Sequence, residues 1–89
     1  MLHPIYNTRF KKDIALAKKR GKDLDKLKTI IELLLDEQPL PPKLKDHKLS
    51  NNYKDRRECH IEPDWLLIYK PHEKSIIFER TGTHSDLFK

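Results

Sequence analysis

The chain has 89 residues, of which 36% are hydrophobic and 37% are charged, and its mean hydropathy is −0.84. This length predicts a single domain, residues 1–89, with a thin core, and no segment approaches the roughly 18 apolar residues of a membrane span. The one cysteine, Cys59, excludes an intrachain disulfide, and the N-terminus lacks the apolar stretch of a signal peptide. We therefore expect a soluble, cytoplasmic protein.

The positive charge is concentrated in the first third of the chain. Residues 1–28 contain nine Lys and Arg and three Asp, a net charge of +6, whereas the whole chain carries +5 and residues 51–89 sum to zero. A basic surface of this kind indicates a polyanion or an acidic protein as partner. A solvated helix face that only aids solubility is the alternative interpretation.

The first part of the chain predicts one short extended segment, residues 3–7, followed by two helices. Asn7 or Thr8 can cap the first helix, because their side chains accept hydrogen bonds from the free N–H groups of a first turn. Gly21 suits the left-handed position after its end. Apolar side chains recur at helical spacing in both helices, so we expect a helical hairpin over residues 8–36.

The middle of the chain, residues 37–54, is predicted to be a polar connection. Pro39, Pro41 and Pro42 end the helical region, because proline lacks the N–H group and constrains the residue before it. A connection of this length is either disordered or functional. Apolar side chains such as Leu44 favour its docking on the rest of the domain.

The last part of the chain predicts an antiparallel meander of three strands. The tail that follows, residues 81–89, is predicted to form a turn and one short helical turn. The central strand should be the second, because its residues are apolar on both faces. The fold class is therefore α+β, with the N-terminal strand and helical hairpin packed on an antiparallel sheet. The strands are expected at residues 56–61, 65–70 and 75–80, with turns at residues 63–64 and 71–74.

Three histidines in separate segments, His47, His60 and His84, are the candidate catalytic residues, together with Asp64 and Arg80. In a strand, alternate residues share a face, so His60 lies beside Glu58, and Arg80 would share a face with Phe78 and Ile76. Cleavage of RNA by its own 2′-OH needs a general base and a general acid, and histidine suits both roles because its pKa is near neutral. Arginine can stabilise the charge on the phosphoryl oxygens.

Aromatic and basic side chains complete the candidate site. Trp65, Tyr53 or Phe88 can stack on a base, although a tryptophan on a central strand more often belongs to the core. Basic residues of the first helix would attract RNA over a distance. The substrate-binding candidates are Trp65, Phe88, Lys11, Lys12, Lys18, Lys19 and Arg20.

Other interpretations of the same residues stay open. Cys59, His60 and His84 can be imagined as a zinc site, but their spacing fits no standard pattern. Asp64 can simply stabilise a turn, and His72 lies in a predicted hairpin turn. We expect no metal requirement and no cofactor, because the sequence has no carboxylate cluster of the two-metal type.

Three runs of the sequence together resemble the YafQ branch of the RelE/ParE toxin superfamily, the toxins of bacterial type II toxin–antitoxin systems. The joint pattern is DHxL, HIxPDWLLIY and RTGTHSxLF, and the resemblance covers essentially the whole chain. The runs lie in residues 45–49, 57–69 and 78–88.

This resemblance implies a RelE-like, microbial-ribonuclease-type fold and a ribosome-dependent endonuclease that cuts mRNA in the ribosomal A site. It carries over the catalytic set His47, His60, Asp64, Arg80 and His84. Our hypothesis for their roles is that His60 or His47 is the base and His84 the acid, that Asp64 orients a histidine or raises its pKa, and that Arg80 binds the scissile phosphate. Phe88 and Trp65 would support the RNA base by stacking, or would support the C-terminal tail of the protein.

The resemblance also implies the partners: a cognate antitoxin, the ribosome and its RNA, mRNA, and operator DNA only through the antitoxin. A non-enzymatic basic nucleic-acid-binding module and an inactive co-repressor are the competing hypotheses.

Overall fold

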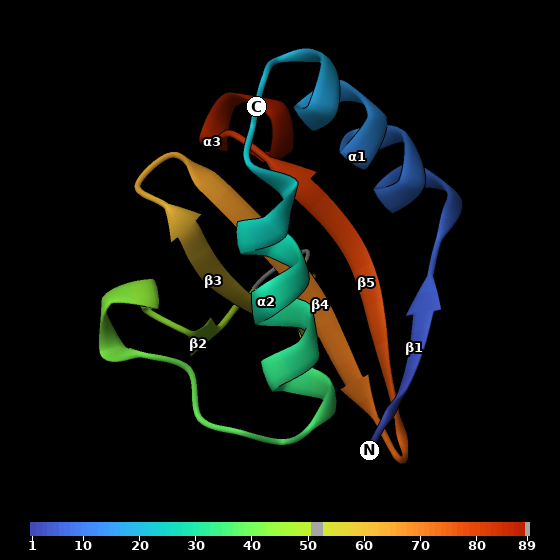
Figure 1. The fold of residues 1–89 in the computed structure, drawn as a ribbon. Coiled ribbons are helices and arrows are strands. Elements are labelled where there is room, and N and C mark those ends of the chain that lie inside the picture. Colours follow the sequence, from blue (N-terminus) through green and yellow to red (C-terminus); the bar gives the residue numbers. More distant parts are fainter. Residues whose placement is uncertain (51–52, 89) are drawn as a thin grey trace.

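The computed structural model describes residues 1–50 and 53–88, which form a five-stranded sheet flanked by helices (Figure 1). Asn51 and Asn52 of the predicted connection and Lys89 of the predicted tail lie outside the described residues. No helix in the described ranges is long and apolar enough to cross a membrane. The elements are β1 (His3–Tyr6), α1 (Thr8–Lys19), α2 (Leu24–Leu35), the 3₁₀ turn η1 (Pro42–Leu44), β2 (His47–Lys48), β3 (Arg57–Glu62), β4 (Trp65–His72), β5 (Ser75–Gly82) and α3 (His84–Leu87).

The predicted helical hairpin is confirmed as α1 and α2. The Oδ1 atom of Asn7 accepts a hydrogen bond from the backbone N of Phe10 at 2.8 Å, and the Asp23 side chain caps α2 through the backbone N of Asp25 at 3.0 Å. Gly21, just beyond α1, has a φ of +79°, which favours glycine. Local signals in the sequence therefore set where both helices begin and where the first one ends.

The sheet has the strand order β1-β5-β4-β3-β2, with β4 in the centre as predicted. The β3-β4-β5 meander is antiparallel, but β1 runs parallel to β5, with His3 opposite Ser75 and Tyr6 opposite Phe78. The predicted antiparallel meander is thus confirmed, and the parallel strand β1 at its edge makes the complete sheet a mixed one. The direction of β1 follows from a tertiary requirement, because the helices that leave it must pack back across the sheet.

The described part of the connection docks on the domain, as the apolar side chain of Leu44 predicted. Leu44 of η1 is buried in the main core. The two-residue strand β2, which was not predicted, pairs antiparallel with β3 and places His47 opposite Glu58. So short a strand has no periodicity of its own, and only its partner defines it.

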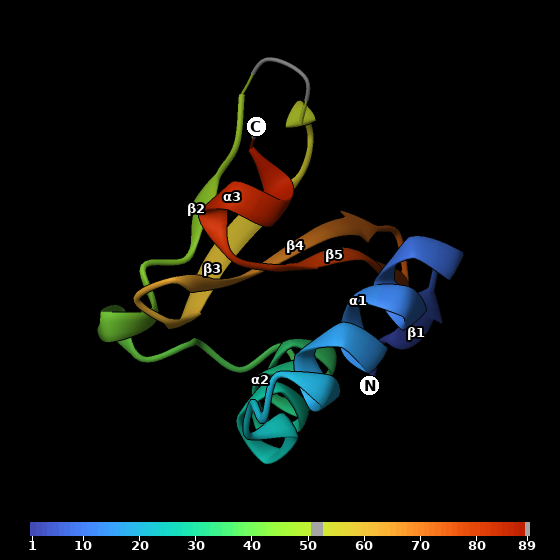
Figure 2. The same cartoon turned by 90° about the horizontal axis from the view of Figure 1, so that it is seen from above.

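The two faces of the sheet are covered differently. The main core lies between the sheet and the α1–α2 hairpin, and Leu67 and Tyr69 of β4 point into it. Their neighbours Leu66 and Ile68 point to the other face, where they form a smaller cluster with Leu87 of α3. Figure 2 shows α1 and α2 on one side of the sheet and α3 on the other.

A β-bulge separates Arg80 from the face predicted for it. Tyr69 pairs with Phe78 but Ile68 pairs with Arg80, so Glu79 is an extra residue in β5. Phe78 faces the helices, whereas Arg80 lies opposite Ile68 on the other face. Strict alternation had predicted that Arg80 shares a face with Phe78 and Ile76, and the bulge corrects that prediction.

Candidate functional site

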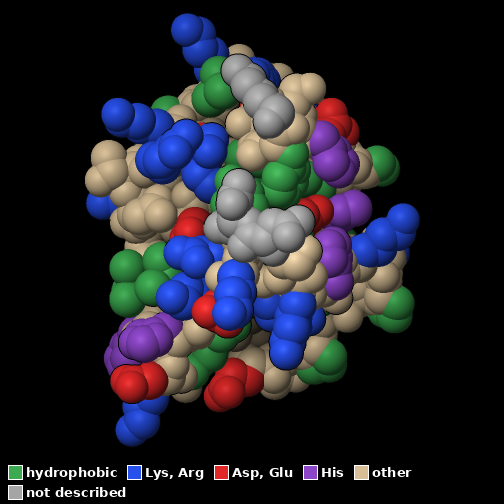
Figure 3. All heavy atoms as spheres, turned by 180° about the vertical axis from the view of Figure 1, so that it is seen from behind, with side chains coloured by type: hydrophobic (Ala, Val, Ile, Leu, Met, Phe, Trp, Pro, Cys, Tyr) green, Lys and Arg blue, Asp and Glu red, His purple; other side chains and the backbone are tan. Residues whose placement is uncertain are grey.

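The three candidate histidines gather on the face of the sheet opposite α1 and α2. His47 comes from β2, His60 from β3, and His84 is the first residue of α3. The His60 ring lies beside both others, with its centroid 6.3 Å from that of His47 and 5.9 Å from that of His84. In Figure 3, which shows the molecule from behind, histidine side chains follow one another along one side of this face. The predicted convergence of three distant segments is present in the structure.

Glu58 is a site residue that was not among the predicted ones. Its Oε1 atom lies 3.0 Å from Nε2 of His60, and Glu58 itself is only 5% exposed. The two residues are two positions apart on β3, so their side chains share a face. A buried carboxylate requires a partner, and His60 supplies it. The spacing of two residues between Glu58 and His60 on a predicted strand was the signal in the sequence that could have identified Glu58.

His84 is held by Asp64 of the β3–β4 turn. One carboxylate oxygen of Asp64 accepts hydrogen bonds from the backbone N of His84 at 2.9 Å and, at 2.6 Å, from its Nδ1. These bonds lower the pKa of Asp64 below its ordinary value, the backbone bond having the larger effect. Because an ionised carboxylate only accepts, Nδ1 of His84 is the donor in this bond, and Nε2 takes no part in it.

His47 is oriented by the segment that precedes it. Its Nδ1 atom lies 2.7 Å from the carbonyl oxygen of Lys45, which has a left-handed φ of 51°. The next residue, Asp46, accepts hydrogen bonds from the Tyr69 hydroxyl at 2.6 Å and from Nε of Arg57 at 3.2 Å. The carbonyl contact makes Nδ1 the donor and leaves Nε2 of His47 free to accept a proton.

Arg80 is paired across the sheet edge with Asp13 of α1. The Nε and Nη2 atoms of Arg80 donate to Oδ2 and Oδ1 of Asp13 at 2.8 and 3.2 Å. The Arg80 side chain is 15% exposed, and the carboxylate raises its pKa above the ordinary value. Two of the three guanidinium nitrogens of Arg80 are therefore already bound by Asp13.

Of the two aromatic candidates, one is buried and one is accessible. Trp65 is 1% exposed in the main core, and its Nε1 donates to Oγ1 of Thr81 at 3.0 Å. The prediction that Trp65 binds substrate by stacking is corrected, because its ring has no free face. Phe88 is 41% exposed and its ring centroid lies 5.4 Å from that of Tyr53, so one side of it is open to a ligand.

The basic candidates lie on the other layer of the molecule. Lys11, Lys12, Lys18 and Lys19 are exposed on α1, whereas Arg20 donates from Nη1 to Oδ2 of Asp86 at 2.7 Å. The described surface also has a groove of about 540 Å³ beside β3 and β4, which the sequence did not reveal because its residues come from three segments. Its lining is rich in positive charge and includes Lys48, Lys54, Arg56, Arg57 and Lys70.

The structure separates the residues of the imagined zinc site. Cys59 is fully buried on the helix face, and burial raises the pKa of its thiol to about 12. Ligand atoms of Glu58, His60 and His84, in contrast, all lie within 4.8 Å of one another. Two imidazole nitrogens and one carboxylate oxygen suit a transition metal, so the residues present fit such an ion, with Glu58 in the place that Cys59 was given.

Comparison with known proteins agrees with this architecture. The family model described as the bacterial toxin of a type II toxin–antitoxin system, YafQ, matches residues 2–89. The mRNA interferase toxin YafQ of Escherichia coli is 51% identical over 84 residues, which cover 93% of this chain and 91% of that protein.

Two solved structures superpose closely on this chain. One is the toxin in the E. coli DinJ–YafQ toxin–antitoxin complex, with a TM-score of 0.91, 46% identity and full coverage of both chains. The other is a metal-bound toxin from Helicobacter pylori, with a TM-score of 0.93, 43% identity and coverage of 99% of this chain and 100% of that one. The chain belongs to the YafQ family of toxins of bacterial type II toxin–antitoxin systems.

Proposed function

We propose that this protein is an mRNA interferase, an endoribonuclease that arrests translation and is neutralised by a cognate antitoxin. The observation that carries the proposal is the histidine cluster, in which His60 and His84 each have a carboxylate partner within 3.0 Å. The E. coli relative is named an mRNA interferase toxin, and the clustered groups match what RNA cleavage needs. The binding of a basic protein to RNA alone would not require paired imidazoles and carboxylates.

The proposed reaction is attack of a ribose 2′-OH on the adjacent phosphorus. The 2′-oxygen forms a bond to phosphorus, the bond to the 5′-oxygen breaks, and a 2′,3′-cyclic phosphate and a free 5′-OH result. One imidazole takes the 2′ proton and a second, entering protonated, gives a proton to the 5′-oxygen. One general base and one general acid on opposite sides of the phosphorus are therefore sufficient for both proton transfers.

The contacts suggest how the roles divide. His60 or His47 is the base, and Glu58 stabilises the imidazolium that His60 would become. His84 is the acid, and Asp64 orients its ring through Nδ1 and leaves Nε2 to face the leaving oxygen. Arg80 binds the phosphoryl oxygens through the side of its guanidinium that Asp13 leaves free.

The ribosome supplies what the domain lacks. Of the two aromatic candidates, Phe88 is exposed and Trp65 is buried. The described face therefore offers little aromatic surface on which the bases of a single-stranded message could stack. We propose that the message is cut in the ribosomal A site, where the ribosome positions it, and that the exposed lysines of α1 contact ribosomal RNA. Both proposals place the protein in the cytoplasm.

The antitoxin is proposed to be an acidic or amphipathic protein that competes for the same basic surfaces. The toxin of the E. coli DinJ–YafQ complex has the same fold, which supports a complex of this kind here. The pair would contact operator DNA through the antitoxin alone.

We propose that cleavage needs no metal ion, because the histidines and Arg80 provide the proton transfers and the charge stabilisation. A metal ion held by Glu58, His60 and His84 would supply Lewis acidity, but it would coordinate two of the imidazoles that the metal-free reaction uses for proton transfer. Cleavage should therefore survive EDTA and weaken when Zn²⁺ is added. Loss of activity in EDTA that Zn²⁺ restores would contradict the metal-free proposal.

The test of the function is cleavage of a defined mRNA on translating ribosomes, with the cut ends mapped. The variant His60→Ala with His84→Ala should lose cleavage at least about 100-fold and should no longer arrest growth. His72→Ala is the matched control, because His72 lies at the opposite end of the β4–β5 hairpin. Growth arrest without cleavage would favour a non-enzymatic binder, and arrest that survives the double substitution would overturn the catalytic assignment.

A further inference from the structure

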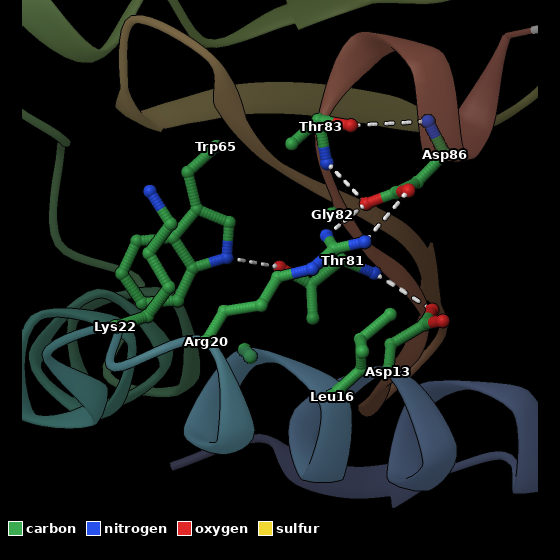
Figure 4. Close-up of a pocket in the computed structure, with 10 residues that line it drawn as sticks. Asp13, Leu16, Arg20, Lys22, Trp65, Thr81, Gly82, Thr83 and Asp86 are labelled. Atoms are coloured by element: carbon green, nitrogen blue, oxygen red, sulfur yellow. Dashed lines mark hydrogen bonds and ion pairs between the residues drawn. The ribbon is translucent and has the colours of Figure 1, made fainter.

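Helix α1 contacts the corner at which β5 passes into α3 at two points. Asp13 and Arg20 are seven residues apart, or about two helical turns, so they lie on the same side of the helix. Asp13 holds Arg80, and Arg20 holds Asp86. Figure 4 shows both side chains directed from α1 toward this corner, which also contains Thr83.

The first contact fixes Arg80 and its backbone together. One oxygen of Asp13, Oδ2, accepts from Nε of Arg80 at 2.8 Å and from the backbone N of Thr81 at 3.1 Å. The pairing of β5 with β1 extends only as far as Phe78. Beyond that point the Asp13 carboxylate takes the place of a neighbouring strand, so the plane of the guanidinium and the strand that bears it are held by one group.

The second contact fixes the helix that carries His84. Asp86 accepts from the backbone N of Thr83 at 2.9 Å and donates its own N–H to Oγ1 of Thr83 at 3.1 Å, which is a capping box. Arg20 binds the same carboxylate at 2.7 Å. Because α3 has four residues and is too short to be stable alone, this tie to α1 contributes, together with the two bonds from Asp64, to the position of His84.

The space enclosed at this corner is too small for a ligand. It measures about 10 Å³, at most the room of one water molecule. A Cβ atom at position 82 would come within 2.9 Å of Oδ2 of Asp86, so Gly82 lets this carboxylate lie against β5. The corner is therefore built as a packed joint and not as a binding site.

We propose that Asp13 and Arg20 are positioning residues: Asp13 sets the Arg80 guanidinium in its reactive place, and Arg20 does the same for the His84 imidazole, which lies beside His60. This inference rests on the proposed function and deepens it. It gives part of the basic helix a second role, because Arg20, although its side chain is 42% exposed, binds Asp86 of the same chain. Misplacement of a reacting group by 1 Å can reduce a rate about 100-fold, so such a brace matters to the reaction even though neither residue touches substrate.

The kinetic test compares Asp13→Asn and Arg20→Gln with two controls, Glu32→Gln and Arg9→Gln, which remove the same charges from exposed helical positions. On ribosomes with a defined mRNA, we expect kcat to fall about 10- to 100-fold in the first pair, with KM changed less than about twofold. The controls should behave as the wild type. Arg20→Lys should recover most of the loss, because it restores the charge at Asp86. An unchanged kcat would overturn the proposal, and a raised kcat would show that Asp13 withholds Arg80 from the reaction.

A second measurement does not depend on activity. In NMR spectra of the folded variants, Asp13→Asn should shift the Nε–H signal of Arg80, and Arg20→Gln should shift the ring signals of His84 while Arg80 stays unchanged. If neither signal moves, the brace does not exist. If wild-type protein does not cleave mRNA, the proposed function fails, and the spectra still decide whether α1 holds the two side chains.

Discussion

The two faces of the sheet divide the work of this small domain. The face toward α1 and α2 carries the main core, with Phe10, Trp65 and Phe78 almost fully buried. The opposite face has a cluster of three buried apolar residues and leaves the histidines partly or fully open to solvent. The contrast teaches that most of the buried apolar side chains, which stabilise the fold, lie on one face, so that the other face can hold polar groups close together.

Neighbouring residues of one strand illustrate this division. Cys59 and His60 are adjacent on β3, yet Cys59 is sealed in the core and His60 sits in the polar cluster. Alternation along the strand is sufficient to separate a buried thiol from a partly exposed imidazole. The bulge in β5 likewise places Phe78 and Arg80 on opposite faces of the sheet.

The largest effect is expected from the helix-covered face. Phe10 is fully buried, and its ring lies 5.8 Å from that of Phe78 and 5.9 Å from that of Tyr6. Phe10→Ala should lower the free energy of unfolding by about 3–5 kcal/mol, measured by urea denaturation. Phe88→Ala, on the other face, should lower the free energy of unfolding far less. Equal losses would contradict the division of the faces.

The next effect is expected in cleavage and not in stability. Glu58→Gln keeps the shape of the side chain but removes the charge beside His60, so the rate of cleavage should fall about tenfold or more. Glu62→Gln is the matched control on the same strand, because Glu62 pairs with Lys22 and Lys26 of the helical hairpin. Comparable losses of cleavage in both variants would remove Glu58 from the site.

Surface charge should have a smaller effect, on binding. Replacement of Lys11, Lys12, Lys18 and Lys19 by Gln should weaken binding to ribosomes and lower the salt dependence by up to about one unit of log–log slope per lost phosphate contact. Lys54→Gln with Lys70→Gln tests the groove beside the histidine face in the same assay. If only the groove variant binds more weakly, the role proposed for α1 is wrong.

The smallest effect concerns stability at low pH. The pKa of Asp86 is lowered chiefly by its bond to Arg20, and that of Asp64 by its bonds to His84. A carboxyl group with a lowered pKa in the folded state stabilises the fold fully above its ordinary pKa of 3.8, and this stabilisation is lost as the pH falls below that value. The melting temperature should therefore drop below about pH 4, and less steeply in Asp86→Asn. An identical pH profile would show that the carboxyl group is not linked to folding.

Much of the fold could be predicted because its signals are local. The cap at Asn7, the left-handed Gly21 and the apolar run at the start of β4 each depend on a few neighbouring residues. The parallel pairing of β1 and the two-residue strand β2 could not be predicted, because each exists only through a partner far away in the chain.

The candidate site divides in the same way. His47, His60, Asp64, Arg80 and His84 were chosen from the sequence by their chemistry and by the family resemblance, and the structure brings the three histidines and Asp64 together. The burial of Trp65 and the partners of Arg80 and Arg20 required the folded chain. Each depends on contacts between residues 16 to 67 positions apart.

The sequence by itself determined the element types, the helical hairpin and the chemical inventory, because propensity, capping and charge act over a few residues. Tertiary structure alone decided on which face Arg80 lies, which carboxylates hold Arg80 and Arg20, and that the basic helix contacts the β5–α3 corner. These features depend on strand register, on one inserted residue at Glu79 and on the crossing of α1 over the sheet edge. Only packing of the whole chain sets such relations, because no short-range preference distinguishes one register from the next.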